Sequence, residues 1–581
     1  MINPKIVKIF DQIGDYYLME DTPFKPAAYH RAARIIESSN VDLEEVYQKG
    51  GIKAVAALPG IGQSMAKKVE EFIKTGQIQE LNDFRQKCPV DLIGLTSIEG
   101  VGPKIVKILY QKLGVRTIDD LEKAALSGMV RHLPRFGEKT EQNILKGIKF
   151  LREHQGRFIL GFVLPFIRQI AQRLRKLPAV ERLEIAGSTR RYKETIGDID
   201  LLIISSQPEL VMDYFCSMPE VEKIYGKGKT KSSVHLDLGI DIDLRVIERK
   251  SFGAAWQYFT GSKEHNIKLR RLAIERGLKI NEYGVFQRKN NNQGEKWLGG
   301  REEKDIYQSV GLPWIPPEIR TNQGEIEAAL KNQLPRIVEY DKILGDLHSH
   351  TNWSDGSGTI EEMARAAIKL GRRYLAITDH SAGLKIAHGL DKKKILRQIK
   401  EIDQVNEKIK SEGINFRLLK GVELNILENG QVDLPDDILA KLDVAAAAVH
   451  HKFRMSKSEM TERICRAMEN PHIDIIAHPT GRLIQSREGY QLDFEKIFNK
   501  ALETKTVLEI NACPNRLDLN DEHIRQAIKL GVKLSIGTDS HNLNQLWHLE
   551  LGIAQARRGW AEEKNIINTW SAEKIIEYFK K

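Results

Sequence analysis

The sequence predicts a multidomain fold of helical N-terminal domains, an α+β middle region and a C-terminal α/β barrel. Its 581 residues exceed what a single hydrophobic core normally serves. Glycine turns that open amphipathic helices recur in residues 1–150, which favours small helical domains there. After residue 345, short apolar strands alternate with helical segments, and a polar residue follows each strand, as in a β/α barrel.

The chain is basic, with a formal net charge of +10 at pH 7. The excess of Lys and Arg falls in residues 1–300, which suggests a polyanion as the partner of that half. The four cysteines lie far apart, and the sequence contains neither a bilayer-spanning apolar run nor a signal-peptide core. We therefore expect a cytoplasmic monomer without membrane contact.

Three similar glycine turns occupy residues 58–62, 98–104 and 133–139, and each precedes an apolar-periodic helical segment. A glycine turn that opens a helix leaves backbone N–H groups unblocked and adds the positive end of the helix dipole. Such a contact binds backbone phosphate and does not read bases. The pattern resembles helix-hairpin-helix DNA-binding motifs, although any single copy could be a plain turn between helices.

Two aspartates mark the middle region. Asp198 and Asp200 begin the apolar run 201–204, and on a strand they project from the same face. Hard Mg²⁺ or Mn²⁺ ions would relieve their repulsion. A further alternating strand carries Asp241 and Asp243, and three acids that hold two metals suit phosphoryl or nucleotidyl transfer. The alternative is an edge strand with solvated acids.

A phosphate cradle precedes these acids. Gly187 and Ser188 offer a tight turn with free N–H groups and a hydroxyl, and Arg190 and Arg191 add fixed positive charge. The turn lies close to the acids in the sequence, so we expect a phosphate site beside a metal site.

Possible metal ligands stand at strand ends throughout the last third of the chain. His348 and His350 share one face at the end of a predicted strand. The others follow later strands or their loops: Asp355, His380, Glu423, His450, His478, Asp539 and His541. Each could singly be a structural residue. Together they indicate clustered metals, which generate hydroxide and favour hydrolysis of a phosphate ester.

With these motifs, residues 1–320 resemble the family X DNA polymerases, whose core is polymerase beta-like. The resemblance implies that Asp198, Asp200 and Asp243 bind two Mg²⁺ (or Mn²⁺) ions. Asp243 is preferred over Asp241 because Asp243 and Arg245 match the family pattern Asp-x-Arg. The nucleotide contacts that it implies are Gly187, Ser188, Arg191, Gly197, Tyr258, Phe259, Gly261, Asn266 and Arg270.

The first hairpin region is similar to the lyase-type domain of the same family. By this resemblance Lys68 would form a Schiff base with a 5′-deoxyribose phosphate, which requires an amine with a depressed pKa. Ser64 replaces a lysine of that pocket, so the alternative is a 5′-phosphate pocket that uses these residues for charge alone. The DNA-binding residues expected here are Lys25, Tyr29, Gly60, Gly62, Gly100, Gly102 and Lys104.

Residues 343–581 resemble the polymerase-and-histidinol-phosphatase (PHP) domain, a distorted (β/α)7 barrel. The nine strand-end residues match its ligand set, which implies a cluster of Mn²⁺ or Zn²⁺ ions and an active hydrolase. The full division is then a lyase-like helix-hairpin-helix domain (1–85), fingers (86–150), a nucleotidyltransferase palm (151–255), a thumb (256–320), a helical linker (321–342) and the PHP domain (343–581).

The resemblance implies a DNA polymerase that fills short gaps in DNA repair, working with dNTPs on gapped or nicked duplexes and primer–template ends near the nucleoid. Its PHP domain would act as a 3′–5′ exonuclease or process 3′ ends, and an abasic-site endonuclease activity stays open. Two alternatives are a template-independent nucleotidyltransferase and a DNA-end-binding protein whose PHP domain hydrolyses small phosphate esters.

Overall fold

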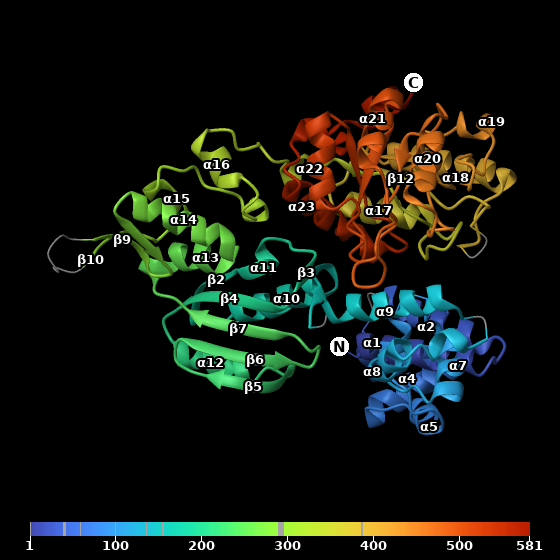
Figure 1. Ribbon diagram of the computed structural model, residues 1–581, viewed down its shortest axis with the longest axis horizontal. Coiled ribbons are helices and arrows are strands. Elements are labelled where there is room, and N and C mark those ends of the chain that lie inside the picture. The colour runs from blue at the N-terminus through green and yellow to red at the C-terminus, as the bar shows by residue number, and fades with distance from the viewer. Residues whose placement is uncertain are drawn as a thin grey trace.

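The computed structural model describes residues 2–38, 42–58, 60–98, 100–134, 136–153, 156–288, 295–384 and 387–580. Its elements form four spatial regions, which lie in chain order along the colour gradient of Figure 1. None of the described helices is both long and apolar enough to cross a bilayer.

The N-terminal region is helical, as predicted. Apolar residues at helical spacing, such as Ile6, Phe10 and Ile13 on α1, form a fully buried face, and the helices share one hydrophobic core. The helices are α1 (Asn3–Met19), α2 (Lys25–Ser38), α3 (Leu43–Ala56), α4 (Gln63–Thr75), α5 (Gln79–Lys87), α6 (Leu92–Thr96), α7 (Pro103–Leu113), α8 (Ile118–Leu126) and α9 (Glu138–Glu153).

The palm contains a five-stranded sheet in the order β2-β4-β7-β6-β5, in which β4 and β7 run parallel. The apolar run 201–204 of β4 is buried. The elements of this region are β1 (Phe158–Ile159), α10 (Leu160–Arg175), β2 (Val180–Ile185), α11 (Gly187–Arg190), β3 (Thr195–Ile196), β4 (Asp198–Ser205), α12 (Pro208–Cys216), β5 (Val221–Lys227), β6 (Lys231–Leu236) and β7 (Asp241–Val246).

The thumb packs two long helices against a three-stranded sheet of order β10-β9-β8. Its elements are α13 (Phe252–Thr260), α14 (Lys263–Glu275), β8 (Leu278–Asn281), β9 (Gly284–Arg288), β10 (Glu295–Gly299) and α15 (Glu303–Ser309). The predicted helical linker is helical only over α16 (Glu325–Leu330), followed by a short 3-10 turn (Tyr340–Lys342). Pro335, which lacks an N–H and fixes φ, lies between them. Ile326 and Ala329 of α16 are buried in the thumb core.

The C-terminal region is the predicted barrel. Seven parallel strands follow one another in sequence order, and a bridge between Ser349 and Ser540 joins the segments after the first and last strands. The strands are β11 (Gly345–Asp346), β12 (Tyr374–Ile377), β13 (Arg417–Asn425), β14 (Val444–Ala448), β15 (Ile475–Ile476), β16 (Val507–Asn511) and β17 (Leu534–Gly537). Helices α17 (Ile360–Lys369), α18 (Lys392–Ser411), α20 (Lys457–Met468), α21 (Phe494–Thr504), α22 (Asp521–Leu530), α23 (Leu549–Arg558) and α24 (Ala572–Phe579) accompany them, together with the short α19 (Asp436–Leu439).

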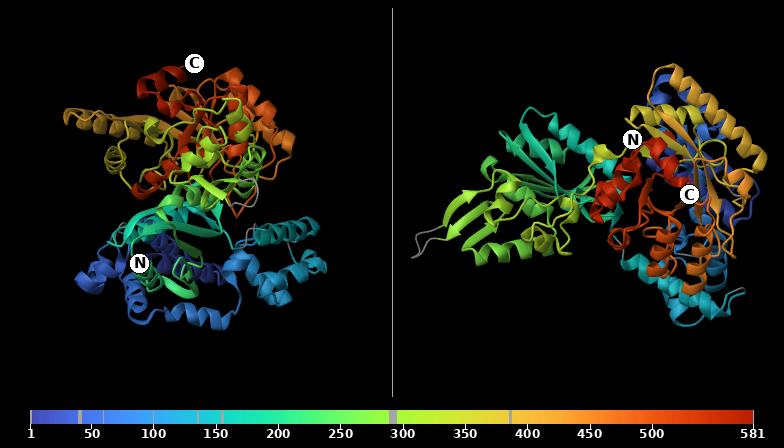
Figure 2. Two further views of the ribbon diagram at one scale, coloured as in Figure 1. Left: turned by 90° about the vertical axis from the view of Figure 1, so that its left-hand side faces the viewer. Right: turned by 90° about the horizontal axis from the view of Figure 1, so that it is seen from above.

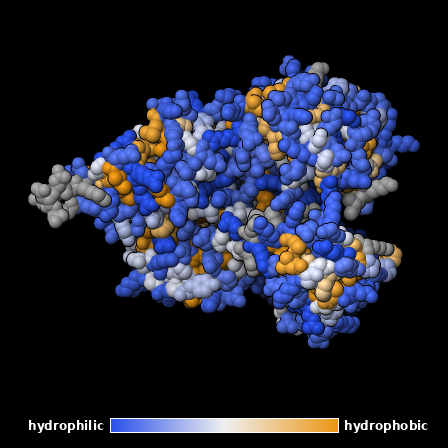
Figure 3. All heavy atoms as spheres, viewed as in Figure 1, coloured by the Kyte–Doolittle hydropathy of each residue, from blue (hydrophilic) through white to orange (hydrophobic). Residues whose placement is uncertain are grey.

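The barrel packs on the palm through α23 (Figures 1 and 2). Leu551 of α23 belongs to the palm core, and a Cβ added at Gly161 of α10 would lie only 2.6 Å from its Cδ1. Ion pairs join the same two regions, including Arg482–Glu194 at 2.6 Å. Hydrophilic residues cover most of the face in Figure 3.

Candidate active sites

The palm acids lie on the neighbouring parallel strands β4 and β7. The register pairs Asp200 with Asp243 and Asp198 with Asp241, so the predicted acids stand side by side at one end of the sheet. Burial and the nearby carboxylate of Asp198 raise the pKa of Asp200 to about 6. The raised pKa means that the charged form of Asp200 is destabilised here, and a bound cation would stabilise it.

Cationic side chains compensate the third acid. Asp243 accepts a hydrogen bond from Ser233 Oγ at 2.5 Å, and its Oδ2 lies 2.9 Å from both Lys231 Nζ and Arg245 Nη2. Burial opposes the shift, but the contacts with Ser233 and Lys231 outweigh it and lower the pKa of Asp243. Lys231 is half-exposed and can move away when a divalent ion arrives.

The predicted phosphate turn is a short helix, α11. Gly187 begins it at φ +65°, and a Cβ at this position would lie 2.7 Å from Asp200 Oδ2. Both the backbone conformation and the close approach to the acid require glycine. Gly197 precedes Asp198 directly, and Ser188 lies in α11, so these predicted nucleotide residues gather around the acids.

The two arginines of the turn serve different partners. Arg190 forms a bidentate pair with Glu303 of the thumb at 2.7 and 2.8 Å, and Arg320 contacts the same carboxylate at 2.7 Å. Arg191 donates to the Thr260 carbonyl next to Gly261, and burial together with neighbouring arginines lowers its pKa to about 10. The turn is therefore fastened to the thumb.

The predicted nucleotide-pocket segment forms the end of α13. Tyr258 and Phe259 lie in its last turn with their rings edge to face, and Gly261 at φ +70° caps it. Asn266 Nδ2 donates to the Tyr258 carbonyl at 2.7 Å, so this side chain fixes the pocket backbone. Arg270 lies one turn further along α14 on the same helix face.

The glycine turns have the predicted geometry. Gly60 and Gly100 adopt φ values of +77° and +84°, and Gly62 and Gly102 are the N-cap residues of α4 and α7. A Cβ at either N-cap glycine would meet no atom within 4 Å, so the helix ends are open to a close ligand. Pro59, Glu99 and Arg135, which belong to these turns, lie outside the described residues. Lys104 follows the second turn and pairs with Asp21 at 2.7 Å.

The lyase-type pocket differs from the sequence-based expectation. Lys68 Nζ lies 3.0 Å from Glu80 and 3.4 Å from Glu71, and although burial opposes it, these carboxylates raise the pKa of Lys68. Glu80 also accepts hydrogen bonds from Tyr29 and Tyr17, and Lys25 Nζ donates to Tyr17 at 2.8 Å. The expected cluster of positive charge is thus neutralised by an acid from α5. This environment is the opposite of the one that Schiff-base chemistry requires.

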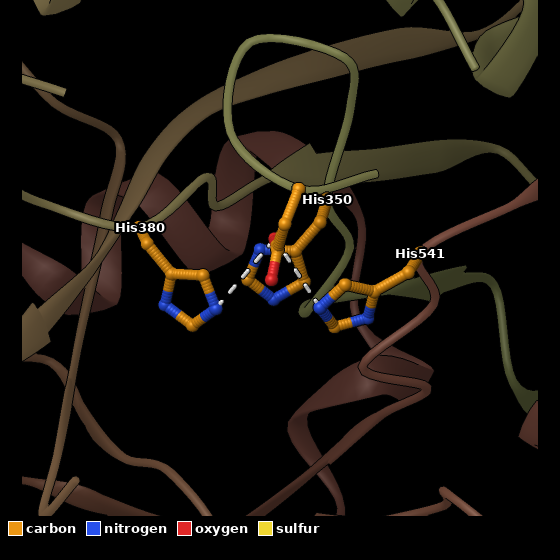
Figure 4. Close-up of side chains that lie close together, drawn as sticks. His350, His380 and His541 are labelled. Atoms are coloured by element: carbon orange, nitrogen blue, oxygen red, sulfur yellow. Dashed lines mark ion pairs between the residues drawn. The ribbon is translucent and has the colours of Figure 1, made fainter. Parts of the chain in front are cut away.

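All nine predicted barrel residues converge at the carboxyl ends of the strands. His350 lies between His380 and His541, with ring centroids 4.4 and 4.3 Å apart (Figure 4). Glu423 is the central carboxylate, 2.8 Å from both His380 and His478 and 3.1 Å from His450. Ligand atoms within 4.8 Å of one another form three groups: His350, Asp355, His380 and His541; His348, His350 and Asp539; His380, Glu423 and His450.

The cluster fits metal ions. Within the described chain, His348 Nε2, both ring nitrogens of His350 and Glu423 Oε2 are buried without a hydrogen bond of good geometry, although Glu423 Oε2 lies 2.8 Å from His380 Nδ1 and His350 Nε2 lies 3.2 Å from Asp539. Burial and the neighbouring imidazoles lower the pKa of His350 to about 3, so its ring is neutral at physiological pH. Buried polar atoms without a good hydrogen bond are costly unless a ligand satisfies them. Mixed imidazole and carboxylate donors are those of a transition-metal site.

Three supporting residues were not predicted from the sequence. Glu509 Oε1 lies 2.7 Å from His348 Nδ1, Asn425 Oδ1 lies 2.8 Å from His450 Nδ1, and Arg516 Nε lies 3.5 Å from Asp539. Partners of this kind orient ligating rings and fix their tautomers. Asn425 is the last residue of β13, the same strand-end signal that identified the ligands, whereas Glu509 is the middle residue of β16.

Known protein families match the helical N-terminal region, the thumb and the barrel. Residues 1–78 and 92–149 match the families described as helix-hairpin-helix domain and SAM-like helix-hairpin-helix tandem. Residues 255–321 match DNA polymerase beta thumb, and residues 346–512 match the PHP domain.

Relatives extend these matches. The chain is 38% identical over 580 residues, 99% of both chains, to the DNA polymerase/3′-5′ exonuclease PolX of Bacillus subtilis (strain 168). It is 25% identical over 350 residues to DNA polymerase lambda of Arabidopsis thaliana, covering 55% of this chain and 62% of the plant protein. A probable phosphatase of Thermoanaerobacter sp. (strain X514) is 32% identical over 251 residues, 41% of this chain and 95% of its own.

Helical hairpins, a polymerase thumb and a metal-binding barrel in one chain define a nucleic-acid enzyme of phosphate chemistry. The chain belongs to the family X DNA polymerases, in the form that carries a PHP domain. The predicted family and fold are confirmed.

Proposed function

We propose that this chain is a gap-filling DNA polymerase whose PHP domain removes nucleotides from 3′ ends as a metal-dependent 3′–5′ exonuclease. The observation that carries the proposal is that one chain holds two separate groups of possible metal ligands, the palm acids and the buried barrel cluster. The relationship to the B. subtilis polymerase/exonuclease over the whole chain supports it. The dNTPs would bind at the palm, and DNA would bind the glycine turns.

In the palm, Asp198, Asp200 and Asp243 would hold two Mg²⁺ or Mn²⁺ ions. When bound, such ions lower the pKa of a primer 3′-OH and neutralise the triphosphate. Gly187 lets the α11 backbone approach the phosphates, and the pairing of Arg190 with Glu303 keeps α11 in place against the thumb. Asn266 holds the Tyr258 backbone that faces the nucleotide sugar in the family.

In the barrel, the nine clustered residues would hold Mn²⁺ or Zn²⁺. When bound, these ions supply a hydroxide nucleophile and stabilise charge on the scissile phosphate. Glu509 and Asn425 orient the rings of His348 and His450. Arg516 places a positive charge beside Asp539, where it can bind a phosphate oxygen.

A labelled duplex with a one-nucleotide gap tests both activities on one substrate. The substrate is incubated with Mg²⁺ or Mn²⁺, with and without dNTPs, and wild type is compared with D198A/D200A and H348A/H350A. We expect extension to vanish only in the first variant and 3′ degradation only in the second. A wild-type protein that neither extends nor degrades any DNA end would refute the proposal, and addition to a single-stranded primer would indicate template-independent transfer.

Small phosphate esters are the second candidate substrate of the barrel, because the probable phosphatase matches that region over 95% of its own length. Release of inorganic phosphate from a panel of small monoesters tests this. Turnover of a monoester together with inert DNA ends would assign the barrel to small-molecule chemistry. The fusion to helical hairpins favours DNA.

A further inference from the structure

A cleft separates α9 from the barrel. It encloses about 490 Å³ and is lined by one face of α9 and by the loops that follow β14 and β15. In Figure 1, α9 lies directly below these barrel loops. The cleft is distinct from the metal cluster and from the palm acids, since it contains none of their residues.

The lining of the cleft is strongly basic. Lys139, Lys146 and Lys149 lie at helical spacing on α9, and Arg454 and Arg487 face them from the barrel. Among the described lining residues, Glu488 is the one carboxylate. Two separate domains therefore contribute positive charge to one narrow space, which is the arrangement that binds a phosphate backbone.

The barrel wall also offers a planar surface. Phe453 and Tyr490 stack with their ring centroids 6.3 Å apart and 15° between their planes. Arg487 lies over the Phe453 ring at 4.2 Å, and its guanidinium is held by the Gly481 carbonyl at 2.6 Å. Tyr490 is buried in the barrel core and Phe453 packs against it, so the flat surface that remains on this wall is the fixed guanidinium of Arg487. Guanidinium planes of this kind stack on unpaired bases.

Two predicted metal ligands belong to the loops that line the cleft. His450 lies two residues after the end of β14, in the loop that carries Phe453 and Arg454, and His478 lies two residues after the end of β15, in the loop that carries Arg487. Three residues of extended chain span at most about 11 Å, so Phe453 lies close to His450. The barrel wall of the cleft therefore shares two loops with the predicted metal site.

The second glycine turn meets the cleft at its other side. A Cβ added at Gly100 would lie 3.4 Å from Arg454 Nη2, and Ser97 from the same turn region lines the cleft. A DNA strand held at this turn would therefore pass directly over Arg454.

From this geometry we propose that the cleft binds a single DNA strand and delivers its 3′ end to the metal cluster. The proposal rests on the exonuclease function proposed above. The cleft volume lies in the range of small-ligand pockets, which suits a short length of one strand. The enzyme would accordingly degrade unpaired 3′ tails faster than paired 3′ ends.

Charge reversal at Lys146 and Arg454 tests the cleft. Both side chains are exposed, which protects the fold, and they come from opposite walls. We expect K146E/R454E to bind a labelled oligothymidine at least tenfold more weakly. The logarithm of the oligothymidine association constant falls linearly with the logarithm of the salt concentration, and the magnitude of this slope should decrease by about 1.4, because two phosphate contacts on a single strand are lost. Degradation of a 3′ tail should fall by a similar factor.

The matched control is K112E/K441E. This pair has the same charge change in the same two regions, but Lys112 lies at the end of α7 away from the turn and Lys441 precedes β14 at the opposite end of the barrel. We expect wild-type binding and degradation from the control. Hydrolysis of bis(p-nitrophenyl) phosphate should be unchanged in both variants, since neither pair of substitutions includes a predicted metal ligand.

Equal binding, salt slope and tail degradation in K146E/R454E and wild type would overturn the cleft proposal while the exonuclease function stands. If wild type degrades no DNA but K146E/R454E still loses oligothymidine affinity, the nuclease function fails and the strand-binding cleft remains. If hydrolysis of bis(p-nitrophenyl) phosphate also falls in K146E/R454E, oligothymidine binding is measured against salt in the milder K146Q/R454Q. A flatter slope than that of wild type supports the cleft, and an equal slope contradicts it. Equal loss of RNA and DNA binding in that variant still supports the cleft, whereas loss of duplex binding alone contradicts it.

Discussion

The palm acids and the barrel cluster differ in how exposed their carboxylates are and in what surrounds them. Asp198 is exposed at one end of the sheet, and Asp243 is neutralised by Arg245 and by the half-exposed Lys231. In the barrel, Glu423 is completely buried and contacts the imidazoles of three histidines: His380, His450 and His478. The palm site is therefore completed by ions and substrate, whereas the barrel site is built before either arrives.

This difference has a physical origin in the two folds. A barrel brings the ends of many strands to one point, so a central carboxylate can meet ligands from several strands. An open sheet offers only neighbouring strands, so its acids stay at an edge that water and DNA can reach. Substitutions should accordingly be far more disruptive in the barrel than at the palm edge.

The largest effect is expected for Glu423→Gln. The amide removes the negative charge that three imidazoles share, and the metal would lose its central ligand. Loss of several kcal/mol of transition-state stabilisation lowers 3′ degradation by more than about 1,000-fold. Gap filling measured on the same preparation should match wild type. A variant that loses both activities equally would contradict the independence of the two sites.

Glu303→Gln tests how firmly the open palm site is anchored. Glu303 is buried between Arg190 and Arg320, and removing one partner of a buried ion network costs about 3–5 kcal/mol. Thermal unfolding of wild type and variant measures the loss. A melting temperature within error of wild type would show that the network does not hold α11.

The same carboxylate predicts a pH dependence. Burial opposes the shift, but the two arginines outweigh it and hold the pKa of Glu303 well below its usual range. A depressed carboxyl pKa stabilises the fold above the unfolded-state value near 4.3, and this contribution is lost as the pH falls toward the folded-state pKa. Unfolding between pH 5 and about 3, compared with Glu303→Gln, should therefore show a steeper decline in wild type.

Glu509→Gln should have an intermediate effect in the barrel. The carboxylate orients His348 without being a predicted ligand, and loss of such a partner typically costs 10–100-fold in metal affinity or activity. The rate of 3′ degradation measured at increasing Mn²⁺ concentration separates this orienting role from direct metal binding or catalysis by Glu509. If Glu509 only orients His348, excess metal should restore most of the rate. Failure of metal to restore it would make Glu509 a ligand or an acid–base group.

The smallest effect is expected for Lys231→Met. Its ammonium competes with a divalent ion for Asp243, and a half-exposed pair of this kind contributes about 0.2–1 kcal/mol. The Mg²⁺ concentration for half-maximal gap filling should fall by a few-fold at most. Lys223→Met on the neighbouring β5 strand is the control and should leave the Mg²⁺ requirement unchanged. A higher Mg²⁺ requirement in Lys231→Met would mean that the lysine assists metal binding.

Local sequence spacing predicted what lies within one element or at one strand end. The spacing of Asp198 and Asp200 and the polar residues after each barrel strand are of this kind. Asp243 was chosen as the third acid by the family resemblance, and its pairing with Asp200 is visible only in the structure. Glu80 could not be predicted as the partner of Lys68, because it comes from a different helix and its effect on the pKa depends on distance. The basic cleft joins α9 to loops more than 300 residues later, so no local pattern announces it.

Because α23 packs on the palm, the boundary between the polymerase half and the barrel does not separate two independent hydrophobic cores. Leu517 and Leu551 of the barrel complete the hydrophobic core beneath the palm sheet, and Glu550 binds both Arg168 and Tyr192. A fragment that ends before the barrel would expose this core to water. The palm and the barrel therefore share one hydrophobic core, and removing the barrel should destabilise the polymerase half.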